Sequence, residues 1–304
     1  MIAVIDIGSN SIRLLIAEVK DGQIINVSTD RVVTRLGQSK VLNTLDRAKM
    51  QKTFKALKRF KDQCKSRGIK RIYSFATSAV READNREQFV SEVRNMGIPC
   101  QVISGQREAK LSFKGAALAL KTEDFVMMDL GGGSLELCYK NNKGEIFGRS
   151  YKIGAVRYTQ KFIKSDPPQK EEISLLKSNL AEEIKKIKKN IGGDVTRKGL
   201  PLVAVGGTAF ALAAVYQKVQ HDRKQQEKIV NTKMPISFLK ELTTKLESGT
   251  ILEREKILGL HRQRAEIIVA GANILLTTAS KLGYNILLVT DGDLRQGFIS
   301  EIAN

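Results

Sequence analysis

Short apolar runs alternate with longer amphipathic stretches along the chain, and this pattern predicts a mixture of strands and helices. The runs at 2–7, 12–19 and near 23–34 predict three successive strands joined by tight turns. Apolar residues then recur at helical spacing near 45–66, and Gly68 is a typical residue to end that helix. The stretches RIYSFAT and PCQVIS predict two further strands, each followed by a helical segment, the second being REAKLSFKGAALAL.

The second half of the chain repeats this order. VMMDLGGGSLELCY predicts a strand, a turn and a strand, and GEIFGRSYKIG predicts a third strand. A long helix should follow, with Ser165 or Asp166 as its N-cap and two prolines in its first turn. PLVAVGG and NILLVTDG each predict a strand that enters a helix, and residues from about 221 to 282 predict a helical insertion ahead of the last of these strands.

The repeated order predicts an α/β protein of two domains that arose by duplication of one unit. We expect the first domain to span 1–123 and the second to span 124–304, with a short polar stretch between them. Two such domains are expected to face each other across a cleft, which is where ligands most often bind.

Each half contains one copy of an unusual turn after its first strand. Aligning Asp6 with Asp129 also aligns Gly8 with Gly131, and a serine follows three positions later in both copies. Glycines allow consecutive backbone amides to converge on an anion, and the aspartate could hold Mg²⁺ together with water and substrate phosphates. A single turn of this composition is usually only a turn. The repetition favours a phosphate site with a metal ion.

The composition is that of a soluble globular protein, apart from its charge. The 304 residues are 42% hydrophobic and 27% charged, and the net charge of +19 predicts attraction to a polyanion. Three cysteines and two histidines do not have the spacing of a metal site, and the cysteines suit a reducing compartment. The start of the chain does not resemble a signal peptide, and no apolar run approaches the roughly 20 residues that cross a bilayer. We therefore expect a cytoplasmic protein that does not bind membranes.

Two lysine-rich helix faces leave two interpretations open. They comprise Lys49, Lys52, Lys55, Lys58, Lys61 and Lys65 in the first half, and Lys185, Lys186, Lys188 and Lys189 in the second. Such faces are most often simply solvated, and the alternative is a binding surface for a long polyanion. No aromatic-rich basic strand or recognition-helix pattern favours nucleic acid.

The two turns, together with the glycine–threonine turn in VAVGGTA, resemble the actin-like ATPase and sugar kinase superfamily. Within it the chain most resembles the short two-domain form of the exopolyphosphatase/guanosine pentaphosphate phosphohydrolase (Ppx/GppA) family. The segments that carry the resemblance are VIDIGSNSIRLLI, FATSAVREADN, VISGQREAKLSFKGA, MDLGGGSLEL, IGAVR, VGGTA, GLHRQRAEIIVAGA and TDGDLRQG. The resemblance implies two RNase H-like domains.

The resemblance also implies roles for individual residues. Glu108 matches the family's catalytic glutamate, which orients the attacking water, and Asp129 and Glu136 match its acidic metal and water partners. Asp6 matches the acidic residue of the first phosphate turn and, with Asp129 and Glu136, is expected to hold Mg²⁺. The residues expected to bind substrate phosphates are Ser9, Asn10, Ser11, Arg13, Arg81, Gly131, Gly132, Gly133, Ser134, Arg157, Gly206, Gly207 and Thr208.

The implied activity is Mg²⁺-dependent release of terminal phosphate from inorganic polyphosphate by an activated water. Hydrolysis of guanosine pentaphosphate, a nucleotide-binding regulator with little turnover, and a kinase of the same superfamily are the alternatives, and a homodimer is left open. Two departures from the family pattern bear on substrate preference. Arg107 stands where an acidic residue is usual, and Arg264-Ala265-Glu266 replaces the usual Arg-Ala-Asp.

Overall fold

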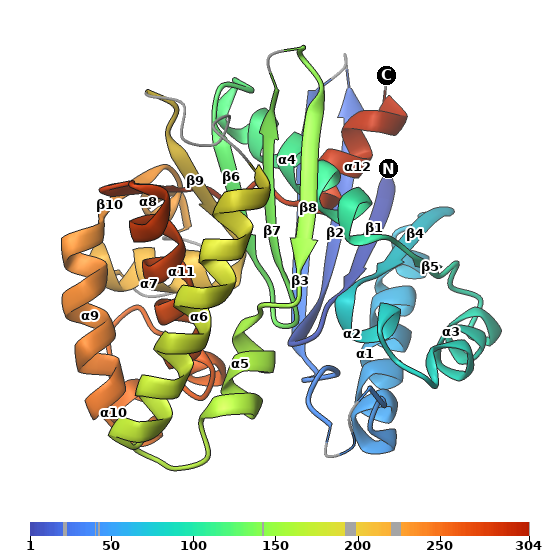
Figure 1. The fold of residues 1–304 in the computed structure, drawn as a ribbon. Helices are drawn as coiled ribbons and strands as arrows, with labels where there is room; N and C mark the ends of the chain where they lie inside the picture. The colour runs from blue at the N-terminus through green and yellow to red at the C-terminus, as the bar shows by residue number, and fades with distance from the viewer. Residues whose placement is uncertain are drawn as a thin grey trace. The chain divides into compact units, whose positions relative to one another are not determined.

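The computed structural model describes residues 1–20, 23–39, 41, 43–141, 143–191, 199–219 and 226–303 (Figure 1). The chain divides into two compact units, which are described separately. The first consists of Met1–Gly115 and Asp293–Asn304, and the second of Ala116–Gly292. The cleft expected between the two domains stays a prediction.

The first unit contains a five-stranded mixed sheet in the order β3-β2-β1-β4-β5. Its strands are β1 (Ile2–Ile7), β2 (Ser11–Lys20), β3 (Gln23–Val33), β4 (Arg71–Ala76) and β5 (Gln101–Val102). The pairs β1–β2 and β2–β3 are antiparallel, whereas β1–β4 and β4–β5 are parallel. The strands and their tight turns agree with those predicted from the apolar runs.

Both faces of β1 are buried, because successive residues of a strand point to opposite sides of the sheet. Ala3 and Ile5 lie in one cluster with residues of α1 (Arg47–Ser66) and α3 (Arg86–Asn95). Ile2 and Val4 lie in another with residues of α4 (Gly105–Leu120) and α12 (Leu294–Ala303). Gly68 ends α1 as predicted, with a left-handed φ of 64° and its amide donating to Lys65 O. A short helix, α2 (Ser78–Arg81), follows β4.

The last helix belongs to the first compact unit, whereas the second domain predicted from the sequence spans 124–304. Leu294 and Ile299 of α12 pack in the cluster that contains Leu111 of α4. The two helices approach closely because Gly115 and Gly297 lack side chains. A Cβ on either glycine would overlap backbone atoms of the partner segment. Sequence position gave no sign of this long-range return.

The second unit contains a six-stranded sheet in the order β10-β11-β9-β6-β7-β8. Its strands are β6 (Val126–Leu130), β7 (Leu135–Lys140), β8 (Ile146–Tyr151), β9 (Leu202–Val205), β10 (Thr232–Pro235) and β11 (Ile286–Val289). Without β10, the order and directions repeat those of the first sheet, with two antiparallel and two parallel pairings. This repetition confirms the predicted duplication of an RNase H-like unit.

The predicted insertion is not wholly helical. Its β10 pairs antiparallel with β11 at the edge of the sheet, and Thr232 and Met234 alternate inward along it. The helices around β10 are α8 (Gln226–Ile229), α9 (Ile236–Ser248), α10 (Ile251–Glu255) and α11 (Ile268–Leu282), with a 3₁₀ turn, η2, at Arg262–Arg264. The start of the predicted insertion, 221–225, lies outside the described residues. The four residues of β10, TKMP, contain no apolar run of the kind that indicated the strands at 202–205 and 286–289.

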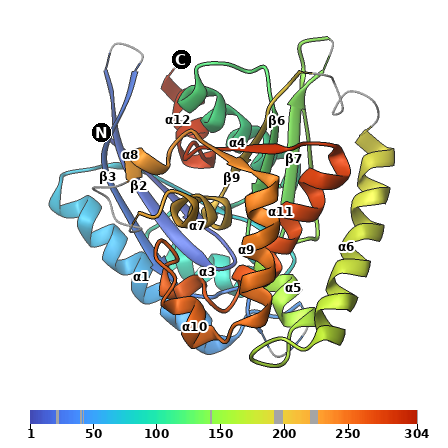
Figure 2. The ribbon, with the colours of Figure 1, turned by 90° about the vertical axis from the view of Figure 1, so that its left-hand side faces the viewer.

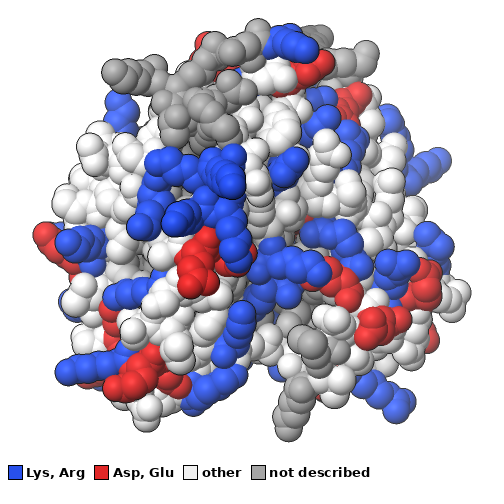
Figure 3. Space-filling view, in the orientation of Figure 1, with Lys and Arg blue, Asp and Glu red and all other residues white. Residues whose placement is uncertain are grey.

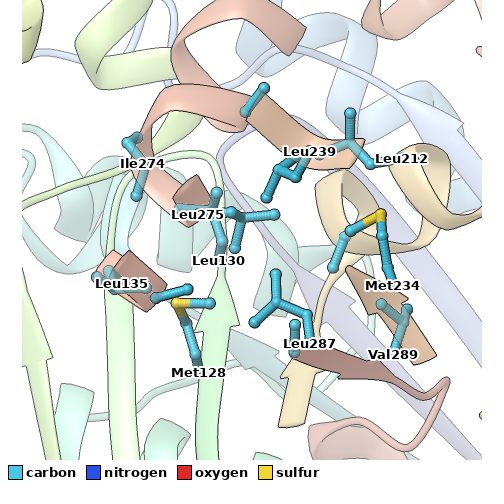
Figure 4. Close-up of a cluster of buried hydrophobic side chains, with 14 of the residues drawn as sticks. Met128, Leu130, Leu135, Leu212, Met234, Leu239, Ile274, Leu275, Leu287 and Val289 are labelled. Carbon is cyan, nitrogen blue, oxygen red and sulfur yellow. The ribbon is translucent and has the colours of Figure 1, made fainter. Parts of the chain in front are cut away.

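The remaining helices of the second unit are α5 (Ala155–Phe162), α6 (Lys170–Ile191) and α7 (Gly207–Tyr216). Figures 1 and 2 show α6 alongside α11, and both contribute to one large apolar cluster with the sheet. Figure 4 shows part of this cluster, in which Met128 and Leu130 of β6 lie near Leu275 of α11. No helix among the described residues is both long and apolar enough to cross a bilayer.

The start of α6 differs from the prediction, because the helix begins at Lys170 and both prolines precede it. Ser165 nevertheless acts near this end. Its Oγ accepts a hydrogen bond from the Gln169 amide at 3.0 Å and donates to Glu172 Oε2 at 2.6 Å. Glu172 also accepts from the amides of Lys164 and Ser165, so this loop is closely tied to the first turn of the helix.

Candidate functional site

The two glycine turns have the same internal hydrogen bond. The Gly8 amide donates to Ser11 O at 3.2 Å, and the Gly131 amide donates to Ser134 O at 3.0 Å. A Cβ on Gly8 would lie 3.1 Å from Ser11 O, and one on Gly131 would lie 3.4 Å from Ser134 O. The sequence repeat is therefore a repeat of backbone hydrogen bonding, and a side chain would be tightly placed at Gly8 but not at Gly131.

The first turn is packed against two other segments of its unit. Ser9 Oγ and Ser78 Oγ, the latter at the start of α2, lie 2.9 Å apart. The Asn10 carbonyl accepts from the amides of Thr34 and Arg35. Asn10 Nδ2, by contrast, is buried and has no hydrogen-bond partner among the described residues. Such a donor is costly to bury without an acceptor. Ser11, the next predicted phosphate ligand, is half-buried at the start of β2.

The carbonyl groups of the second turn are occupied by the first residues of α5. Ala155 N donates to Gly131 O at 3.1 Å, and Arg157 donates to Gly132 O from its amide and to Gly133 O from Nε at 2.8 Å. Arg157, predicted to bind substrate phosphate, thus holds the turn itself through Nε.

The amides of the same turn remain available. Within the described residues, the amides of Gly132, Gly133 and Ser134 donate to no protein acceptor. Three successive donors without an acceptor form the kind of backbone nest that binds anions. Gly154 allows α5 to reach the turn, because a Cβ there would overlap Gly132 O.

A third glycine turn lies beside the second one. Gly206 has a φ of 93°, and a Cβ on it would lie 2.7 Å from Leu130 O and 2.9 Å from Asp129 Oδ1. Thr208, at the start of α7, is buried. The structure therefore brings the predicted turn at 206–208 together with Asp129.

One residue at this turn was not among the predicted ligands. The guanidinium of Arg264 occupies the space that a side chain on Gly207 would fill, and Arg264 is only 7% exposed. The sequence showed the arginine as part of a family pattern, but it gave no distance to a turn more than fifty residues earlier. Burial of an arginine is unusual enough to indicate a role.

In the first unit, the aspartate of the turn has an arginine opposite it. Asp6 on β1 pairs with Arg13 on β2, and Arg13 donates to Asp6 Oδ2 from Nε at 2.9 Å and from Nη2 at 2.5 Å. Asp6 Oδ1 lies toward the Gly8 turn. Arg13 Nη1 also lies 3.0 Å from Asp293 Oδ2, which connects the turn to the residue preceding α12.

Asp293 is almost fully buried and lies between two arginines. Its carboxylate accepts hydrogen bonds from Arg295 Nε and Nη2 and is ion-paired with Arg13. Burial alone would raise the pKa of Asp293, but Arg295 and Arg13 outweigh burial and lower the pKa to about 2. Arg295 Nη1 also donates to Leu14 O, so the cluster fixes the end of the chain on the first sheet.

In the second unit, the equivalent aspartate has a carboxylate opposite it. Asp129 on β6 pairs with Glu136 on β7, which is 1% exposed. Ser150, the next residue across the sheet on β8, donates to Glu136 Oε1 at 2.6 Å. Like charges directly opposite each other across a sheet are destabilising unless something compensates them. A bound cation would provide that compensation.

These two carboxylates suit a metal that takes few protein ligands. Among the described residues, no group of three or more His, Cys, Asp or Glu side chains could hold a metal ion. Zinc commonly takes three or four protein ligands, whereas Mg²⁺ is typically held by one or two carboxylates, with water and substrate phosphates completing its shell. Asp129 and Glu136 beside a phosphate-type turn therefore fit Mg²⁺.

Glu108 and Arg81 are brought together in the first unit. Glu108 lies in the first turn of α4 and is 8% exposed, and Arg81 Nη1 donates to its Oε2 at 2.8 Å. The same Nη1 donates to Ile103 O at 3.1 Å. Arg81 is thus anchored by a backbone carbonyl, and it fixes the orientation of the glutamate carboxylate.

Arg107, the departure beside Glu108, is paired within the first unit. Its guanidinium forms a two-pronged ion pair with Glu301 of α12, and Lys114 of α4 contacts the same carboxylate at 2.8 Å. The unusual arginine has therefore a structural partner of its own in the C-terminal helix.

Comparison with known proteins agrees with the fold and with the motifs. Residues 15–304 match the model of the Ppx/GppA phosphatase family. The chain is 30% identical to Exopolyphosphatase 2 of Mycobacterium tuberculosis, with 99% of this chain and 98% of that protein covered. It is 26% identical to Exopolyphosphatase 1 of Mycobacterium leprae, with 98% of this chain and 88% of that protein covered.

Solved structures give the same result. A crystal structure of the Aquifex aeolicus member of the Ppx/GppA family is 30% identical, with a TM-score of 0.80 over 99% of this chain and 96% of that one. An exopolyphosphatase from Cytophaga hutchinsonii is 26% identical, with a TM-score of 0.87 over 99% and 97%. The predicted enzyme class, a phosphoanhydride hydrolase, is confirmed, and the chain belongs to the Ppx/GppA phosphatase family.

Proposed function

We propose that this protein is an Mg²⁺-dependent exopolyphosphatase that releases terminal phosphate from inorganic polyphosphate by attack of water. The observation that carries the proposal is the pair of opposed carboxylates, Asp129 and Glu136, next to a glycine turn. Among the described residues, the amides of Gly132 to Ser134 in this turn have no protein acceptor. Negative side chains and free backbone donors side by side suit a ligand that contains both a cation and phosphate groups.

The proposed phosphate ligands are the two repeated turns and the turn at 206–208. In the first turn, Asn10 Nδ2 would donate to a phosphate oxygen, which would satisfy a buried donor that has no partner among the described residues. In the second, the amides of Gly132 to Ser134 would do the same. Phosphate oxygens can accept several hydrogen bonds at once, so a turn with several donors is well matched to them.

Asp129 and Glu136 would hold Mg²⁺, and Ser150 keeps Glu136 in place by its hydrogen bond. When bound, the ion would neutralise phosphate charge that develops during cleavage of the anhydride bond. Asp6 is less suited to bind the metal than Asp129 and Glu136, because Arg13 already neutralises its Oδ2. Only Asp6 Oδ1, on the side of the Gly8 turn, would be available to a metal-bound water.

Glu108 would orient the attacking water and accept its proton. Phosphoryl transfer has a loose transition state in which positioning of the nucleophile matters more than strong basicity. The salt bridge from Arg81 suits this task, because it fixes the carboxylate without removing it as an acceptor. Arg81 would in addition place positive charge close to the phosphate oxygens.

Glu108→Gln tests the proposed base. Turnover should fall by about 10²–10⁴-fold, the usual contribution of such a group, while binding of polyphosphate persists. Glu123→Gln is a matched control, because Glu123 is an exposed glutamate whose ion pair with Lys140 lies elsewhere. Near-normal turnover of Glu108→Gln on every phosphoanhydride tried would refute the assignment.

Glu136→Gln tests the proposed metal site. The Mg²⁺ concentration for half-maximal rate should rise, because a hard cation loses an anionic ligand, and thermal stability without Mg²⁺ should stay constant or increase as like-charge repulsion is removed. A lower stability together with an unchanged Mg²⁺ titration would show that Glu136 is a structural partner of Ser150 only.

We propose polyphosphate rather than guanosine pentaphosphate as the substrate because of the basic face of α6. Lys185, Lys186, Lys188 and Lys189 are exposed, and Figure 3 shows Lys and Arg side chains gathered over the C-terminal part of this helix. Some of them have protein partners, since Lys186 pairs with Glu183 and Lys188 donates to Lys281 O. A long polyanion could contact such a face, whereas a nucleotide is too short to reach far beyond one site.

The comparison of long-chain polyphosphate, tripolyphosphate and guanosine pentaphosphate discriminates between these substrates. Replacing the four lysines of α6 by glutamine should weaken only the long chain and should flatten the dependence of its KM on salt. The same replacement of the exposed lysines of α1 (Lys52, Lys55, Lys58 and Lys65) gives a control for overall charge. A higher kcat/KM for the nucleotide, with no response of KM to either replacement, would assign the nucleotide as substrate.

A further inference from the structure

Arg254 is a buried arginine that the proposed reaction does not use. It lies in α10 of the second unit and is 2% exposed. Nε donates to Gly249 O at 3.2 Å, Nη1 to Ala265 O at 2.6 Å, and Nη2 to Asp166 Oδ1 at 3.0 Å. Its guanidinium therefore joins the carbonyls on either side of α10 to the carboxylate of Asp166, which lies 88 residues earlier in the chain.

Asp166 is fixed independently of Arg254. Its two carboxylate oxygens accept from the Ile251 amide at 2.9 and 3.1 Å. The loop that carries it is tied to the start of α6 by the hydrogen bonds between Ser165 and Glu172. Asp166 is thus anchored to α6, a long helix that packs in the core of the unit.

The residues that Arg254 holds on its other side adjoin the third glycine turn. Ala265, whose carbonyl accepts from Arg254, directly follows Arg264, and the Arg264 guanidinium fills the space above Gly207. Arg264 lies in a 3₁₀ turn of three residues, and the nearest preceding helix, α10, has five. Such short elements do not fix a side chain by themselves.

We propose that Arg254 and Asp166 are a positioning pair that holds Arg264 over the turn at Gly206–Thr208, where Arg264 contacts a phosphate of the substrate. Arg254 is buried, whereas the side chain of its partner Asp166 is 38% exposed. Burying a guanidinium is costly unless its donors are satisfied, so a buried arginine held by three acceptors is better explained by what it orients. A guanidinium has a planar fork that fits a carboxylate and two carbonyls at fixed angles, and a lysine cannot reproduce it. The inference rests on the proposed function only for the identity of the ligand.

The main test is Arg254→Lys, with Asp166→Asn as a second variant on the other side of the pair. Misplacement of a binding group by about 1 Å can cost as much as 10²-fold. We therefore expect KM for tripolyphosphate to rise by about 10–100-fold, with a much smaller change in kcat. Arg264→Gln should show the same pattern, because it removes the group that the pair orients.

The combination Arg254→Lys with Arg264→Gln separates positioning from a general loss of stability. If Arg254 acts through Arg264, the double variant should have the KM of Arg264→Gln alone, since residues that share one role are not additive. Lys177→Gln is the matched control. It breaks an ion pair between α6 and α9, the one with Glu247 at 2.9 Å, and should leave KM unchanged.

Binding of inorganic pyrophosphate, followed by the shift in melting temperature, gives a readout that does not require turnover. The shift should shrink in Arg254→Lys and in Arg264→Gln but not in Lys177→Gln. Additive effects of Arg254→Lys and Arg264→Gln, or an unchanged KM and pyrophosphate shift in both Arg254→Lys and Asp166→Asn, would overturn the inference. So would an unaltered pyrophosphate shift in Arg264→Gln. A wild-type protein that binds pyrophosphate but hydrolyses no polyphosphate would refute the proposed function and leave the positioning pair standing.

Discussion

Replacement of Asp293 by asparagine removes the buried negative charge between Arg13 and Arg295 while keeping the shape of the side chain. Asp293 is 4% exposed, so water does little to screen its interaction with the two guanidinium groups. Arg13 keeps its hydrogen bonds to Asp6 in the variant, and Arg295 keeps its bond to Leu14 O. The variant should therefore fold, with a lower stability of the first unit.

The size of the loss follows from the pKa. Arg295 and Arg13 together outweigh burial and lower the pKa of Asp293 from 3.8 to about 2, and one pKa unit corresponds to about 1.4 kcal/mol. The charged form of Asp293 thus contributes about 2 kcal/mol to the free energy of unfolding. Because the pKa is lowered by folding, this contribution is complete above the unfolded pKa near 4 and is lost as the pH falls toward 2.

The assay is urea unfolding of wild type and Asp293→Asn at several pH values, with hydrogen exchange of β1 and α12 reporting on the first unit. At pH 7 the variant should be about 2 kcal/mol less stable, and the difference should shrink between pH 4 and pH 2. Asp62→Asn is the control, because Asp62 belongs to an exposed pair with Lys58 and should change stability by well under 1 kcal/mol. A difference that stays constant from pH 7 to pH 2 would refute the reasoning, since it would show that the charge of Asp293 is not what stabilises the unit.

Two further changes test the packing of α5 on the second turn and the ion pairs of α12. Gly154→Ala should lower the free energy of unfolding by about 1–3 kcal/mol and weaken pyrophosphate binding, because the new methyl group would overlap Gly132 O. Gly249→Ala is the control: a Cβ there has ordinary contacts, so thermal melts and pyrophosphate binding should not change. Glu301→Gln should cost about 1 kcal/mol at pH 7, discounted for the exposure of Arg107, and the loss should disappear in acid. Burial would raise the pKa of Glu301, but its hydrogen bonds from Arg107 and a lysine of α4 outweigh burial and lower the pKa. The stabilisation by Glu301 is therefore lost as the pH falls, and thermal melts at pH 7 and pH 3 measure this loss.

Most of the two sheets could be predicted from the sequence, because short apolar runs and the glycine turns that follow some of them are local features. The duplicated turns were recognisable for the same reason, since Asp6 and Asp129 start identical short patterns. The close approach of Glu108 and Arg81 was implied only by the family resemblance. The two residues are far apart in sequence, and no periodic pattern relates a helix N-terminus to a short helix in another strand–helix pair.

Features that depend on long-range packing could not be predicted. The return of α12 to the first unit depends on Gly115 and Gly297 meeting at one point, and each alone looks like an ordinary helix glycine. The same holds for Arg264, whose burial depends on Gly207 having no side chain. In each case a group from a distant segment occupies the space where a glycine lacks a Cβ. The sequence shows the glycine but not the group that packs against it.

The divergence of the two turns explains how one duplicated unit could come to serve two roles. The residue opposite the aspartate is Arg13 in the first copy and Glu136 in the second, so one row carries an ion pair and the other carries two negative charges. The first turn is therefore already neutralised by its own side chains, and it is suited to contact an anion directly. In the proposed function the second turn would take a cation together with an anion, which would couple phosphate binding there to metal binding. The two copies thus differ in the sign of the charge opposite a retained aspartate, while the internal hydrogen bond of both turns remains the same.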